Sequence, residues 1–77
     1  MSMEKNYKYW VARDKNGRLF IYDTPIFKDE KYGHWSAWGD VYLELHPNSF
    51  PEVKWEDEEP RAVYFDEKGQ LRLVIDK

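Results

Sequence analysis

The residue types that carry out chemistry in proteins are present in this chain of 77 residues, but they are scattered. His34 and His46 lie twelve residues apart, and a metal site can be drawn with Asp40 between them. That spacing matches no ligand pattern typical of metal sites, and the chain has no cysteine to supply thiolate ligands. Two surface histidines explain the same facts, so we expect no metal and no other cofactor.

Nucleophilic catalysis is equally weakly supported. It needs a serine beside a base, with an acid that orients the base. Ser36 and Ser49 are the candidates, and neither lies in a glycine-bracketed elbow. Consecutive acids such as those of residues 56–59 are normally solvated and ionised, whereas a general acid must be desolvated enough to keep its proton. We therefore expect a protein that is not an enzyme.

Aromatic side chains are a better indication of a binding surface. Tyr32, Trp35 and Trp38 lie in a segment bounded by glycines that holds more rings than a connection requires. Exposed rings stack on sugars, nucleobases or a protein partner. The alternative, which we favour for Trp35 and Trp38, is that they complete the core of a domain too small to form one otherwise. Trp10 and Trp55 are expected in the core first.

The acidic run Glu56, Asp57, Glu58 and Glu59 also has two interpretations. It is either a solvated loop that maintains solubility, which we favour, or an anionic patch around Trp55 that steers a basic partner. It is too short to mimic DNA. Open sheet edges are a third surface, available to a partner's strand or to a second copy of the chain. The candidate partner-binding residues are thus Tyr32, Trp35, Trp38, Glu56, Asp57, Glu58 and Glu59.

Two hairpins are predicted to position these residues. Residues 7–13 and 18–23 flank the turn 14–17, and residues 61–65 and 70–75 flank the turn 66–69. Both turns have the form D-x-x-G-polar-Leu, in which Asp bonds the following backbone and Gly adopts a positive φ. A shared turn chemistry explains this similarity better than a duplicated unit. Because Leu19 and Ile21 alternate with Phe20 and Tyr22, we expect the first hairpin to be covered on both faces.

Between the hairpins, residues 40–45 alternate as a strand, which we expect to be central, with Val41, Leu43 and Leu45 on its buried face. Residues 26–27 and 34–38 are a weaker pair of strands. Residues 47–51 allow one short helical turn, with Phe50 anchoring it to the sheet. The fold class predicted is all-β: a small single antiparallel sheet, or a partly open barrel, of about five main strands built from hairpins.

Composition limits the chain to one domain, predicted as residues 7–77 after a flexible segment 1–6. The chain is 42% apolar and 18% aromatic, with a net charge of −3 and no cysteine, which fits a reducing cytosol. The polar N-terminus lacks the apolar run of a signal peptide, and no stretch resembles a membrane span. Residues 1–39 carry seven basic and five acidic side chains, and residues 40–77 carry five basic and ten acidic ones. This balance does not predict the concentrated basic face that nucleic-acid binding requires, so we do not expect general nucleic-acid binding.

The segments FPEVKWEDEEP (residues 50–60) and YWVARDKNG (residues 9–17) resemble a loose group of short proteins encoded by phages, prophages and other mobile elements of bacteria. The similarity spans residues 7 to about 64, whereas residues 27–39 are individual to this chain. The resemblance implies a bacterial or phage cytoplasmic setting and an accessory role, and it transfers no catalytic residue. The leading hypothesis is therefore a module that binds a host or phage protein. The alternative is an aromatic platform for single-stranded nucleic acid or glycan.

Overall fold

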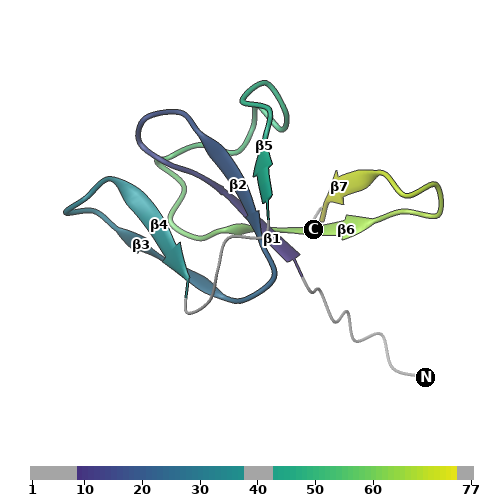
Figure 1. The fold of residues 1–77 in the computed structure, drawn as a ribbon, viewed down its shortest axis with the longest axis horizontal. Coiled ribbons are helices and arrows are strands. Elements are labelled where there is room, and N and C mark those ends of the chain that lie inside the picture. The colour runs from purple at the N-terminus through teal and green to yellow at the C-terminus, as the bar shows by residue number, and fades with distance from the viewer. Residues whose placement is uncertain (1–8, 38–42, 75–77) are drawn as a thin grey trace.

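The structure, a computed structural model, describes residues 9–37 and 43–74 of the chain. Its regular elements are all strands, which follow one another as β1 (Tyr9–Arg13), β2 (Leu19–Tyr22), β3 (Ile26–Asp29), β4 (His34–Ala37), β5 (Leu43–Leu45), β6 (Arg61–Phe65) and β7 (Leu71–Leu73) (Figure 1). No helix occurs in these residues, and the all-β prediction is confirmed. The predicted flexible segment 1–6 lies outside the described residues.

Five strands form one antiparallel sheet in the order β5-β2-β1-β6-β7, which curls into a half-barrel, and β3 and β4 form a separate two-stranded sheet (Figure 1). β1 is central because it pairs with β2 through Trp10↔Tyr22 and with β6 through Trp10↔Ala62. The prediction of a central strand at residues 40–45 is therefore wrong, since β5 lies at the sheet edge beside β2. Leu43, expected to be buried, is 54% exposed because no described strand lies beyond it.

The two predicted hairpin turns have the same geometry. Gly17 N–H donates to the Asp14 carbonyl over 2.9 Å, and Gly69 N–H donates to the Asp66 carbonyl over the same distance. Both glycines have a positive φ, 94° at Gly17 and 81° at Gly69, a region that other residues adopt only with strain. Shared turn chemistry thus accounts for the D-x-x-G similarity.

Each face of the central hairpin is covered by a different segment. On the side that we call the loop face, Val11, Leu19, Ile21 and Val63 are buried against Val53 of the β5–β6 connection. On the opposite side, the hairpin face, Ala12 and Tyr22 are buried against Trp35 of β4, with other partly buried side chains around them: Phe20, Ile26, Ala37 and Trp55. The prediction that both faces are covered is confirmed.

The β5–β6 connection is a series of tight turns. Ser49 N–H donates to the His46 carbonyl, Val53 N–H to the Phe50 carbonyl and Asp57 N–H to the Lys54 carbonyl. Residues 47–51 therefore form turns where a short helical turn was predicted. Phe50 packs against the loop-face core, as expected of an anchor, and it does so with a φ of 50°.

A candidate protein-interaction surface

Trp35 is a core residue and cannot serve as a contact. It is only 5% exposed, and its two N–H groups both have acceptors. The backbone N–H donates to Asp14 Oδ1 over 3.0 Å, and the indole Nε1–H donates to the Arg13 carbonyl over 3.1 Å. These bonds fix the β3–β4 hairpin to the β1–β2 turn. The interpretation of Trp35 as a core residue is confirmed, and its side chain offers little surface to a partner. Trp38 lies outside the described residues.

Lys28 connects the β3–β4 hairpin to the acidic run of residues 56–59, which we call the acidic loop. Its Nζ lies 4.5 Å from the ring centroid of Trp55 and 5.2 Å from that of Trp35, and it donates to the Trp55 carbonyl over 2.6 Å. The two indoles meet edge to face, with centroids 6.4 Å apart. Cation–π contacts of this kind contribute about 0.5–2 kcal/mol each, depending on desolvation. Trp55, and with it the acidic run that starts at the next residue, is therefore attached to the β3–β4 hairpin.

Tyr32 is the most exposed large aromatic side chain in the described residues, at 67%. It lies in the turn between β3 and β4, where its ring stacks on His34 with a centroid distance of 6.1 Å and an angle of 23°. Lys31 Nζ lies 5.4 Å from the same ring. Tyr32 therefore presents a large amphipathic surface beside the His34 ring, of the kind that aromatic side chains offer to a partner at a low cost in side-chain entropy.

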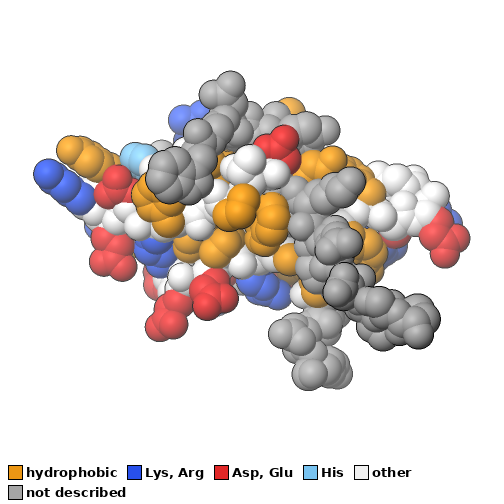
Figure 2. Space-filling model, turned by 90° about the horizontal axis from the view of Figure 1, so that it is seen from below, with side chains coloured by type: hydrophobic (Ala, Val, Ile, Leu, Met, Phe, Trp, Pro, Cys, Tyr) orange, Lys and Arg blue, Asp and Glu red, His pale blue; other side chains and the backbone are white. Residues whose placement is uncertain are grey.

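The four acids of residues 56–59 do not share one role. Asp57 is half-buried, and its Oδ2 accepts the Lys54 N–H over 3.1 Å, so this side chain stabilises its own turn. Glu56, Glu58 and Glu59 are exposed and make no ion pair in the described part of the chain. Seen from below in Figure 2, acidic side chains gather on the half of the molecule that carries β3 and β4.

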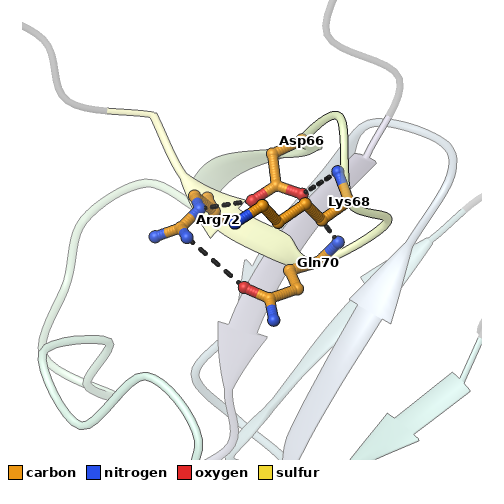
Figure 3. Close-up of polar contacts among 4 residues, drawn as sticks. All are labelled: Asp66, Lys68, Gln70 and Arg72. Atoms are coloured by element: carbon orange, nitrogen blue, oxygen red, sulfur yellow. Dashed lines mark hydrogen bonds and ion pairs between the residues drawn. The ribbon is translucent and has the colours of Figure 1, made fainter.

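Two carboxylates outside the acidic run, Glu44 and Asp66, are each paired with an arginine. Arg18 binds both carboxylate oxygens of Glu44 at 2.9 and 2.8 Å, and this hydrogen bonding lowers the pKa of Glu44. In the β6–β7 turn the Asp66 carboxylate accepts Arg72 Nε–H over 2.6 Å and two backbone N–H groups over 2.9 Å each (Figure 3). The Arg72 hydrogen bond is the main cause of the lowered pKa of Asp66. The carboxylates of Glu56, Glu58 and Glu59 have no comparable arginine partner in the described residues.

The candidates for other chemistry are not assembled. Ser36 Oγ lies 3.4 Å from His34 Nδ1, but the same nitrogen is 3.0 Å from the Trp35 carbonyl. In the tautomer that donates to this carbonyl, Nδ1 carries the proton and is not available as a base toward Ser36. Within residues 9–37 and 43–74, no three side chains of the kinds that bind metals converge. Asp40, the proposed third ligand beside the histidines, lies outside that range.

One organising residue was missed from the sequence. Arg13 points from the end of β1 into the β5–β6 connection, and its five N–H groups donate to five backbone carbonyls: Val53 at 2.7 Å, Gly17 at 2.8 Å, Pro47 at 2.9 Å, Ser49 at 3.1 Å and Phe50 at 3.2 Å. An arginine has five donors, so every one is used. The only signal in the sequence was a basic residue directly before a tight turn, which does not identify a contact some 40 residues away.

Fold and surface together define a small all-β domain, with a hairpin and an acidic loop side by side on one half. Comparison with protein-family models, with curated proteins and with solved structures finds no match to this chain. Within the described residues, no helix has the length and hydrophobicity that crossing a membrane requires.

Proposed function

We propose that this protein is a small interaction module that binds a basic surface of another protein, through Tyr32 and the exposed carboxylates of Glu56, Glu58 and Glu59. The observation that carries the proposal is that the acidic loop, whose exposed carboxylates make no ion pair in the described residues, is attached through Trp55 and Lys28 to the hairpin that presents Tyr32. Complementary charge accelerates encounter, and a fixed aromatic ring at the contact adds affinity.

The biological setting is proposed from the resemblance described above. An accessory role in the cytoplasm of a bacterium, on behalf of a phage or another mobile element, is what that resemblance implies, with a host or phage protein as the partner. The alternative platform for nucleic acid or glycan has less support. Trp35, one of its proposed stacking rings, is buried. The exposed carboxylates of Glu56, Glu58 and Glu59 would repel phosphate.

The proposal is tested by affinity capture from a bacterial lysate with the intact chain and three variants. The triple variant Glu56→Gln, Glu58→Gln and Glu59→Gln is expected to reduce capture at least tenfold, and Tyr32→Ala to reduce it severalfold. The matched control for the ring is Tyr64→Ala, since Tyr64 is also exposed, at 41%, but lies on β6. Equal capture by all variants, or capture that does not weaken as salt rises, contradicts the proposal.

A further inference from the structure

β3 is an edge strand of its two-stranded sheet. β3 pairs only with β4, so one side of it has no neighbouring strand in the described structure. In Figure 1, β3 is drawn below β4. A two-stranded sheet gains stability when a third strand is added.

The pairing of β3 with β4 determines which backbone N–H and C=O groups of β3 point outward. Antiparallel ladders alternate between hydrogen-bonded and non-hydrogen-bonded pairs. Trp35 N–H donates to Asp14 Oδ1, away from β3, so Lys28↔Trp35 is a non-hydrogen-bonded pair. The N–H and C=O of Lys28 consequently point outward, and by the two-residue period those of Ile26 do so too.

The charges of the segments near β3 favour a basic strand over a second copy of this chain as the segment that pairs with it. Residues 23–31 and 54–60 together hold seven carboxylates and three lysines. The lysine nearest the edge, Lys28, directs its amine inward to the Trp55 carbonyl. A second copy of the chain would bring the same carboxylates against each other, whereas a lysine- or arginine-rich strand would place opposite charges beside them. The edges of β5 and β7 are only three residues long and adjoin residues outside the described ranges.

We propose that a basic, extended segment of the partner protein adds to β3 as a third strand, hydrogen-bonded to the outward N–H and C=O groups of Ile26 and Lys28. This inference rests on the proposed function and specifies how the partner is held. Strand addition gives affinity through the main chain, and alternate side chains of the segment give specificity. The excess of carboxylates in residues 23–31 and 54–60 then favours lysine or arginine in the added strand.

The test uses the full chain made by chemical synthesis with an N-methyl group on the Lys28 amide, which removes one outward donor and keeps every side chain. The control carries N-methylation at Glu67, whose position after Asp66 in the turn tolerates the loss of an N–H. The probe is a ten-residue peptide of alternating lysine and valine, compared with one of alternating glutamate and valine. Kd is measured by titration, and amide exchange at Ile26 and Lys28 is measured by NMR.

We expect only the basic peptide to bind, to slow exchange of both amides, and to bind at least tenfold more weakly to the chain methylated at Lys28 than to the control. Equal binding to the two methylated chains, or binding to the unmodified chain without slower exchange, overturns the inference. So does a self-associated state that the Lys28 methyl group abolishes, since the occupant is then a second copy. If the triple Gln variant reduces capture from lysate but methylation of the Lys28 amide does not, this inference alone is overturned. If the triple Gln variant does not reduce capture, the proposed function is overturned.

Discussion

Removing the guanidinium of Arg13 is expected to destabilise this protein more than removing any other surface arginine. The variant Arg13→Met keeps much of the apolar stem and leaves five backbone carbonyls without their donor. A typical internal hydrogen bond contributes about 0.5–1.5 kcal/mol net. Because these carbonyls are only partly buried and can bind water instead, we use the lower end of that range and expect a loss of about 3 kcal/mol.

That loss is a large share of the total. Domains have about 0.05–0.15 kcal/mol of stability per residue, which gives roughly 4–12 kcal/mol for this chain. At about 4–8 °C per kcal/mol for a domain of this size, the Tm is expected to fall by roughly 12–24 °C. Arg13→Lys is expected to fall between the wild type and Arg13→Met, because three donors on one nitrogen cannot reach carbonyls spread over the whole connection.

The assay is urea unfolding followed by tryptophan fluorescence, with Arg72→Met as the control. Arg72 is exposed and bonds only within the β6–β7 hairpin, so its loss is expected to change the midpoint much less. Amide exchange at Val53, whose N–H is bonded within the clamped connection, is expected to accelerate in Arg13→Met. If Arg13→Met and Arg72→Met have the same midpoint, or if Arg13→Lys equals the wild type, the reasoning is refuted.

Three further predictions concern backbone strain and pH. Phe50 has a φ of 50°, so Phe50→Gly is expected to be about 1 kcal/mol more stable than Phe50→Ala. At Phe20 in β2 the opposite order is expected, with the alanine variant more stable than the glycine variant. Urea midpoints that show the same order at both positions would contradict this prediction. Burial raises the pKa of Tyr22 to about 12, so the unfolded chain ionises first, and stability that is intact below about pH 10 is expected to fall as pH rises toward 12. Tyr22→Phe should show a smaller decline between pH 8 and 11, and an unchanged decline would exclude this cause. The pKa of Asp66 is lowered mainly by the Arg72 hydrogen bond, so its contribution to stability is present at neutral pH and is lost as acid protonates the folded state. In Arg72→Met the NMR titration of the Asp66 carboxyl is expected to move up toward the ordinary range, and a titration that stays in place would show that the backbone bonds alone set it.

The sequence by itself predicted the hairpins well. A D-x-x-G turn requires a positive φ at its last residue, and this requirement is local, so Gly17 and Gly69 could be placed without any tertiary information. The alternation of Leu19 and Ile21 with Phe20 also indicated correctly that β2 is covered on both faces, because a strand exposes successive side chains to opposite sides. Local conformation and facial alternation are properties of neighbouring residues.

Tertiary structure alone decided which strand is central, which acids bond within the chain and what Arg13 contacts. β5 alternates as a core strand would, yet it lies at an edge because β6 returns to pair with β1. The acids of residues 56–59 are alike in sequence, but Asp57 bonds its own turn while Glu58 is exposed. Arg13 is one of several basic residues until the β5–β6 connection folds over it. These outcomes depend on contacts between segments far apart in the chain, and no local pattern encodes which segments meet.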